Sequence, residues 1–160
     1  MEVLEEIKEY FDIEEFVDEP TFKKYGQRSW QFICPMLLET LLVIRKELDK
    51  PITINNWKWG GKFSQRGLRT NLCDIVKSKT NKNKLYLSAH VLGKAIDFDV
   101  QGMSAEDVRI WIQRNENLFP YKLRLEHKLK GNPISWVHLD VYENENNPHI
   151  YLLMYSYGKV

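Results

Sequence analysis

The stretch from residue 88 to residue 100 constrains this chain most, because it joins two candidate metal ligands to a change in secondary-structure preference. His90 and Asp97 stand seven residues apart, on either side of Gly93. The residues before the glycine tolerate a helical turn, whereas the apolar residues after it favour a strand. Two ligands do not complete a metal site, so a third donor must come from a distant segment.

The segment from residue 136 to residue 141 is the candidate to supply that donor. It alternates in the manner of a strand and carries His138 at its centre. Zinc binds nitrogen and oxygen donors in a tetrahedral shell, and a catalytic site keeps three protein ligands and one open position. His90, Asp97 and His138 fit this requirement in type and number. The alternative is that these histidines are structural and simply hydrogen-bonded within the fold.

Side-chain alternation separates a polar face from a buried face on both predicted strands. His138 shares its face with Asp140, and Asp97 shares its face with Asp99. Carboxylates commonly accept a hydrogen bond from a ligand imidazole and so fix its orientation. Asp140 or Asp99 is therefore expected to orient a ligand histidine.

The length of 160 residues predicts a single domain, and the order of helical and strand patterns predicts the α+β class, with a small, mostly antiparallel sheet packed against helices. Residues 1–50 form a predicted helical part, and residues 51–155 form a predicted metal-binding core. Helical spacing occurs at 1–17, 35–49, 71–79 and from 104 onward, and strand patterns occur at 52–56, 122–127, 135–142 and 149–155. Residues 22–32 look irregular. The turn residues at 131–133 predict that the second and third strands form a hairpin.

Charge and composition exclude several classes of protein. A formal net charge of +1 supports neither nucleic-acid binding nor membrane attraction, and no apolar run is long enough to insert into a membrane. The acidic N-terminus does not resemble a signal peptide, so we expect a chain made and kept in the cytoplasm unless another protein exports it. Cys34 and Cys73 are expected to be reduced, buried thiols.

Together, the two segments resemble the signature of a known enzyme family. The matching positions are Ser88, His90, Gly93, Ala95 and Asp97, followed by Trp136, Val137 and His138. This pattern is similar to that of the M15 zinc peptidases, the D-alanyl-D-alanine carboxypeptidases and phage endolysin peptidases of the hedgehog/DD-peptidase fold. The resemblance covers residues 50–142. It implies one zinc ion held by His90, Asp97 and His138, and a phage or prophage origin.

The chain departs from the family at the catalytic base. Family members carry a glutamate three residues before the last ligand histidine, and here that position is Ser135. Glu126 is the substitute that the hairpin suggests, because its strand would neighbour the strand of His138. The alternative for Glu126 is a solvated carboxylate on a strand.

The resemblance also implies a substrate and the residues that hold it. Arg69 is expected to bind a substrate carboxylate, and Ser88 is expected to contact the substrate or support the site, whereas Arg66 is expected to be a surface residue. The implied activity is hydrolysis of peptide bonds in the stem or cross-bridge of peptidoglycan, on the cell wall if the protein is released or virion-borne. The alternative is an inactive, zinc-stabilised binding or virion structural domain of the same fold.

Overall fold

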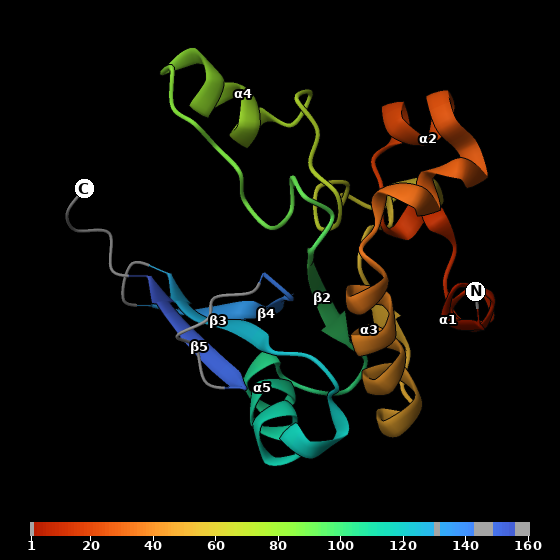
Figure 1. Cartoon of the computed structure of the whole chain (residues 1–160), viewed down its shortest axis with the longest axis vertical. Helices are drawn as coiled ribbons and strands as arrows, with labels where there is room; N and C mark the ends of the chain where they lie inside the picture. Colours follow the sequence, from red (N-terminus) through yellow and green to blue (C-terminus); the bar gives the residue numbers. More distant parts are fainter. Residues whose placement is uncertain (1, 130–131, 143–148, 156–160) are drawn as a thin grey trace.

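The computed structural model describes residues 2–129, 132–142 and 149–155. Helices and a small sheet lie side by side, so the predicted α+β class is confirmed (Figure 1). Residues 130–131, which include the first residue of the predicted turn at 131–133, lie outside these ranges. Within the described ranges, no helix is long and apolar enough to cross a membrane.

The N-terminal part is helical, but the helix predicted at 1–17 ends at Ile7. It contains α1 (Glu2–Ile7), α2 (Glu19–Tyr25) and α3 (Pro35–Leu48), with 3-10 turns at Ile13–Glu15 and Gly26–Phe32. Proline occupies the first turn of α3, where its missing N–H costs nothing, and Asp49 ends the helix in the left-handed region at φ 46°. The expectation of irregular structure at residues 22–32 was wrong. Asp18 accepts a hydrogen bond from the Thr21 N–H and so starts α2.

Within the described residues, the sheet has five strands in the order β1-β2-β4-β3-β5. Its strands are β1 (Ile52–Thr53), β2 (Ala95–Val100), β3 (Leu123–Leu129), β4 (Asn132–Asp140) and β5 (Ile150–Tyr155). Strands β3 and β4 pair antiparallel, as the hairpin prediction required, and only β5 runs parallel to its neighbour β3. Strand β1 is shorter than the predicted strand at 52–56, since the chain turns into a 3-10 helix at Trp57–Trp59.

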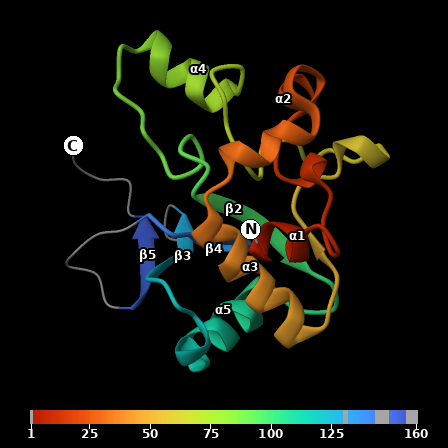
Figure 2. The same cartoon turned by 45° about the vertical axis from the view of Figure 1, so that its right-hand side comes forward.

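Helices cover the sheet and share its core. Figure 2 shows α3 and α1 in front of the strands and α5 (Ala105–Arg114) below them. Ser104 caps α5 by accepting the Asp107 N–H, as its position before the acidic first turn predicted. Buried side chains of α3, β2, β4 and β3, such as Leu41, Phe98, Val137 and Leu125, belong to one hydrophobic cluster. The N-terminal helices therefore pack against the strands that carry the candidate ligands.

The segment between residues 69 and 94 leaves the sheet before returning to β2. It contains α4 (Asp74–Asn81), which begins three residues later than the predicted helix at 71–79. In Figure 1, α4 lies apart from the strands, at the end of a long excursion of the chain. Both cysteines are free thiols, but only Cys73 is buried, so the expectation that Cys34 is also buried was wrong.

The carboxylate of Glu15 makes the stability of the N-terminal part depend on pH. Burial raises its pKa to about 7, and the charges of Asp12 and Glu14 act in the same direction. Because the folded pKa exceeds the ordinary value of 4.5, this contribution to stability is complete below pH 4.5 and is lost as the pH rises through about 7. The free energy of unfolding should therefore fall across this interval.

We expect Glu15→Gln to remove that fall, which is about 1–2 kcal/mol after allowance for solvent screening. Glutamine keeps an oxygen that can accept the Asp12 N–H. Urea denaturation at pH 4.5 and pH 7.5 measures the difference, with the exposed carboxylate change Glu5→Gln as the control. Equal pH dependence in the parent and in Glu15→Gln would contradict the prediction.

Candidate metal centre

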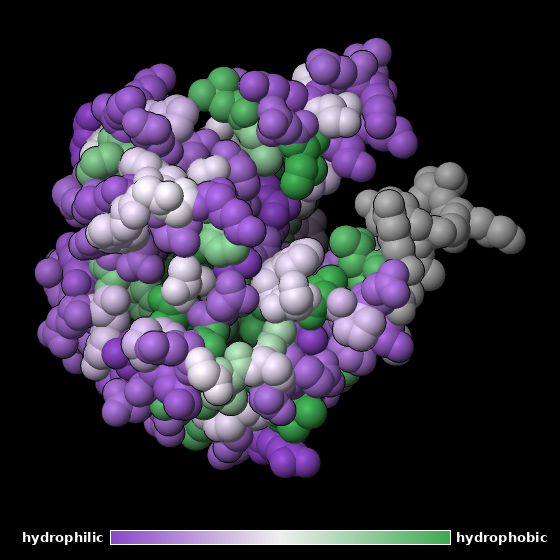
Figure 3. Space-filling view, turned by 180° about the vertical axis from the view of Figure 1, so that it is seen from behind, coloured by the Kyte–Doolittle hydropathy of each residue, from purple (hydrophilic) through white to green (hydrophobic). Residues whose placement is uncertain are grey.

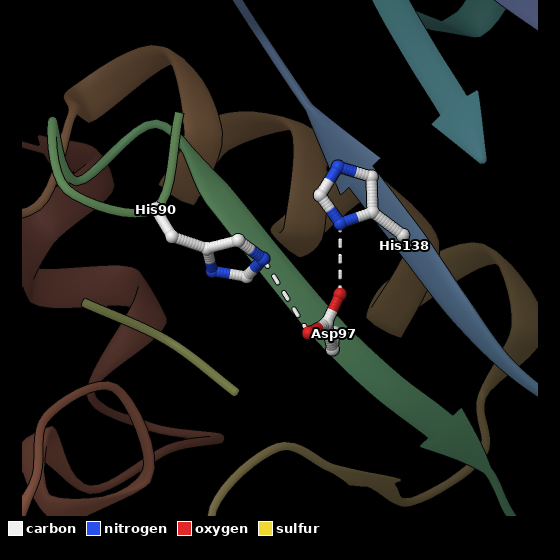
Figure 4. Close-up of side chains that lie close together, drawn as sticks. All are labelled: His90, Asp97 and His138. Atoms are coloured by element: carbon white, nitrogen blue, oxygen red, sulfur yellow. Dashed lines mark hydrogen bonds and ion pairs between the residues drawn. The ribbon is translucent and has the colours of Figure 1, made fainter. Parts of the chain in front are cut away.

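Three potential ligands from three segments meet at the middle of the sheet. His90 lies in the turn before β2, Asp97 lies within β2, and His138 lies in β4 (Figure 4). Asp97 and His138 are directly opposite each other in the antiparallel β2–β4 ladder, so their side chains share one face. One ligand atom from each of the three residues lies within 4.8 Å of the others. The predicted ligands are thus brought together.

The ring of His90 is held so that one nitrogen faces Asp97. Its Nδ1 donates to the carbonyl oxygen of Gly67 at 2.8 Å, and its Nε2 lies 3.4 Å from Asp97 Oδ2. Only 3% of His90 is exposed, and burial lowers its pKa, which favours the neutral ring. A neutral imidazole that donates through Nδ1 has its free lone pair on Nε2. That lone pair points at the carboxylate.

In His138 the roles of the two ring nitrogens are reversed: Nε2 is held by a hydrogen bond, and Nδ1 faces Asp97. Its Nε2 lies 3.0 Å from Asp140 Oδ2, and its Nδ1 lies 2.8 Å from Asp97 Oδ1. Asp140 is fully buried and is itself fixed by Arg124, whose Nε and Nη2 donate to its two oxygens at 2.7 and 3.1 Å. An N–H at Nε2 that donates to Asp140 leaves Nδ1 as the nitrogen available to a metal.

This arrangement could hold a metal ion. Two imidazole nitrogens and one carboxylate converge on a buried point, and each ring uses its other nitrogen in a hydrogen bond. Donors at about 2.1 Å from a tetrahedral metal lie roughly 3.3 Å from one another. His90 Nε2 lies 3.4 Å from Asp97 Oδ2, close to that value, whereas His138 Nδ1 lies 2.8 Å from the other oxygen, Oδ1, at hydrogen-bond distance.

Charge in the site is arranged around Asp97. Burial alone would raise its pKa, but hydrogen bonds from His138 and His90 outweigh burial and hold it well below the usual range. Burial would lower the pKa of His138, yet its bonds to Asp140 and Asp97 raise it to about 10. A proton therefore takes the place of a cation between His138 and Asp97, and a metal ion must displace that proton to bind.

Glu126 belongs to the same row of side chains. It is the register partner of His138 in the β3–β4 ladder, as Asp97 is on the other side. Glu126 is half-buried, and burial raises its pKa, while the charges of His138 and Arg69 lower it. The row Asp97, His138 and Glu126 thus places a partly desolvated carboxylate beside the candidate ligands.

Arg69 lies in the site, where it binds a candidate ligand. Its Nη2 donates to Asp97 Oδ2 at 2.9 Å, and its Nε donates to the Gln65 carbonyl oxygen at 2.9 Å. The guanidinium is thus held beside the candidate ligands by a backbone carbonyl and a buried carboxylate.

The remaining candidates have local partners. Ser88 is half-buried, and its Oγ accepts a 3.4 Å hydrogen bond from the Val91 N–H in the turn that carries His90. Asp99 contacts Arg66 Nη1 at 2.6 Å. Among the two carboxylates considered for orienting an imidazole, Asp140 is the one that contacts a ring. The Arg66 guanidinium, with only 13% of its side chain exposed, also lies over the Phe63 ring, so its expected surface position was wrong.

Two contributors to the site were not identified from the sequence. Arg124 alternates in step with Glu126 along β3, and this spacing is the signal that could have found it. The Gly67 carbonyl that orients His90 gives no such signal, since any residue type offers a backbone oxygen. The chain approaches Phe16 so closely at Gly67 that an added Cβ would lie 2.1 Å from the Phe16 carbonyl oxygen.

The backbone conformation at Gly93 explains why the motif has a glycine at this position. Its φ is +66°, and an added Cβ would lie 1.9 Å from the carbonyl oxygen of Phe32. Its own carbonyl accepts the Cys34 N–H at the start of α3. Glycine alone combines this backbone conformation with this close approach. The turn carrying His90 is thereby fastened to the N-terminal helices.

Comparisons of the chain with protein-family models, with curated proteins and with solved structures found no match. The functional interpretation therefore depends on the motif residues and on the geometry of the site.

We expect His138→Ala to lower metal content from one equivalent to a small fraction, because two donors hold a metal far less tightly than three. The free energy of unfolding should also fall by about 3 kcal/mol, since the buried Asp97 and Asp140 lose a partner. Elemental analysis and thermal unfolding with and without a chelator measure both effects. His127→Ala, which changes a histidine beside Glu106, is the control. Undiminished metal content in His138→Ala would remove it from the ligand set.

Gly93→Ala should destabilise the fold more than Gly102→Ala. Both residues have positive φ, at 66° and 75°, so both substitutions carry the conformational cost of about 1 kcal/mol. Only Gly93 also meets backbone, whereas the nearest atom at Gly102 is Lys50 Nζ at 4.0 Å. Urea denaturation should show an additional loss of about 2 kcal/mol or more at Gly93. Equal losses would contradict the close-approach explanation.

Proposed function

We propose that this chain is a zinc-dependent peptidase that hydrolyses peptide bonds in the stem or cross-bridge of peptidoglycan, and that it is encoded by a phage or prophage. The observation that carries the proposal is the convergence of His90 Nε2, His138 Nδ1 and the Asp97 carboxylate, with each remaining ring nitrogen already bonded. Zinc in catalytic sites is commonly held by three donors of these types, with a fourth position left for catalysis. The motif resemblance to the M15 family supplies the substrate class.

Zinc, when bound, supplies a Lewis acid that polarises a peptide carbonyl and makes water a better nucleophile near neutral pH. Glu126 is the residue that would take the proton from the attacking water and return it to the leaving amine. Two features support this role: its place opposite His138 in the sheet and a pKa raised by burial. A carboxylate with a raised pKa accepts a proton more readily, which suits the first of these two steps.

Arg69 is the residue that would hold a substrate carboxylate. Its side chain is 15% exposed, and its guanidinium donates a hydrogen bond to Asp97. Arginine presents several N–H donors in a planar fork, so a guanidinium bound to Asp97 through Nη2 retains donors for a second carboxylate. Ser88 is half-buried and lies two residues before His90, where it would contact the substrate or support the turn.

The second candidate function is a metal-stabilised binding or virion structural domain without hydrolysis. One observation favours it: Ser135 stands where the resembled family has its catalytic glutamate, and its side chain is exposed on β4. Serine cannot take the proton of an attacking water as a carboxylate does. The two candidates thus differ in whether Glu126 performs that step.

Glu126→Gln separates them. We expect full zinc content and a fall in hydrolysis by about 10²–10⁴-fold, because glutamine preserves the shape of the side chain but cannot accept the proton. Release of peptides or amino acids from purified peptidoglycan, followed by mass spectrometry, measures the activity. Glu116→Gln, an exposed carboxylate change outside the site, is the matched control. If zinc-loaded parent protein releases nothing from peptidoglycan, the enzyme proposal fails and the binding domain remains.

A further inference from the structure

A second surface stands apart from the candidate metal centre. It is formed by residues 71–88, named here the α4 arm, which contain α4 and the loop that returns towards His90. Figures 1 and 2 both show α4 at the outer end of this excursion, away from the five strands. The arm carries several large aliphatic side chains in solvent: Leu85 is 88% exposed, Leu87 56%, Leu72 50% and Ile75 44%. Such a concentration in one segment requires an explanation.

These exposed aliphatic side chains do not belong to the hydrophobic core. The inner face of the arm is already packed, since Cys73 and Val76 are 2% and 8% exposed. Tyr86, between the two exposed leucines of the loop, is half-buried, and Lys79 lies over its ring at 5.7 Å. The arm thus has a packed side, while Leu85 and Leu87 remain exposed to solvent.

The arm is also basic. It contains four lysines and one aspartate, a net charge of +3, whereas the whole chain carries +1, so the other residues together carry −2. Lys77, Lys82 and Lys84 are exposed and stand among the exposed aliphatic residues. In Figure 3, hydrophobic groups lie beside strongly hydrophilic ones on the upper part of the molecule. The near-zero total charge conceals this segregation.

We propose that the α4 arm binds the surface of an anionic phospholipid membrane. Aliphatic side chains would enter the boundary between headgroups and acyl chains, and the neighbouring lysines would attract the anionic headgroups. Charge complementarity selects this occupant. A soluble anionic polymer would pair with the lysines but would leave Leu85 and Leu87 in water. A neutral apolar partner would bury the leucines and leave the lysines without counter-charge.

This proposal is independent of the proposed hydrolysis, because the arm residues are distinct from His90, Asp97 and His138. The contact lies in the plane of the membrane surface and needs no spanning segment. It would hold the protein beside a membrane through a segment whose chain continues directly into the turn of His90.

Co-sedimentation with vesicles tests the proposal. The full chain should bind vesicles of phosphatidylglycerol and phosphatidylcholine in equal amounts and should not bind vesicles of phosphatidylcholine alone. Lys82→Gln with Lys84→Gln should weaken binding about 30-fold, since each lysine near an anionic leaflet contributes about fivefold. Leu85→Ser with Leu87→Ser should weaken it about tenfold or more. Binding should also fall when added salt shortens the screening length.

Matched controls change similar residues elsewhere. Ile110→Ser alters an aliphatic side chain that is 37% exposed on α5, and Lys23→Gln alters an exposed lysine on α2. Both should bind vesicles as the parent does, and thermal unfolding should confirm that every variant is folded. Equal binding to neutral vesicles would overturn the proposal. Loss of binding in Lys82→Gln with Lys84→Gln but not in Leu85→Ser with Leu87→Ser, together with full competition by soluble polyphosphate, would overturn it in favour of an anionic polymer.

Discussion

The buried carboxylate of Asp97 is the interaction on which the site depends. Its oxygens face His138, His90 and Arg69 at 2.8, 3.4 and 2.9 Å, and the side chain is 9% exposed. A buried anion is costly unless donors or cations surround it, so the three neighbours and the carboxylate stabilise one another only as a group. A metal ion at this point would satisfy the same requirement with a larger charge.

The fold supplies that group through strand register and close backbone approach. The β2–β4 and β4–β3 ladders align Asp97, His138 and Glu126 in one row, and a shift of one residue in either ladder would turn a side chain to the opposite face. Gly93 lets the turn of His90 touch the N-terminal helices. The helical part thus has a direct role in the site, because it fixes the third ligand.

The candidate metal centre and the α4 arm depend on different kinds of interaction. The candidate metal centre is small and buried, and the rings of His90 and His138 and the carboxylates of Asp97 and Asp140 each have defined partners. The α4 arm is exposed and carries both lysines and aliphatic side chains. Its proposed binding depends on the combined charge and apolar area of these side chains rather than on exact geometry. The chain joins them within a few residues, since the arm ends at Ser88 and the first ligand is His90.

The sequence alone determined the strands of the site, the capped helix at Ser104 and the three residues that meet, because alternation, capping and motif spacing are local patterns. It gave a poor account of residues 19–32, where short 3-10 and helical turns depend on packing, and of Arg66, whose burial depends on Phe63 and Asp99. Only the tertiary structure decided which nitrogen of each histidine is available, that Arg124 holds Asp140, and that Leu85 and Leu87 of the α4 arm are exposed. Contacts of this kind join residues far apart in the chain, and their geometry is set by register and packing that no local pattern specifies.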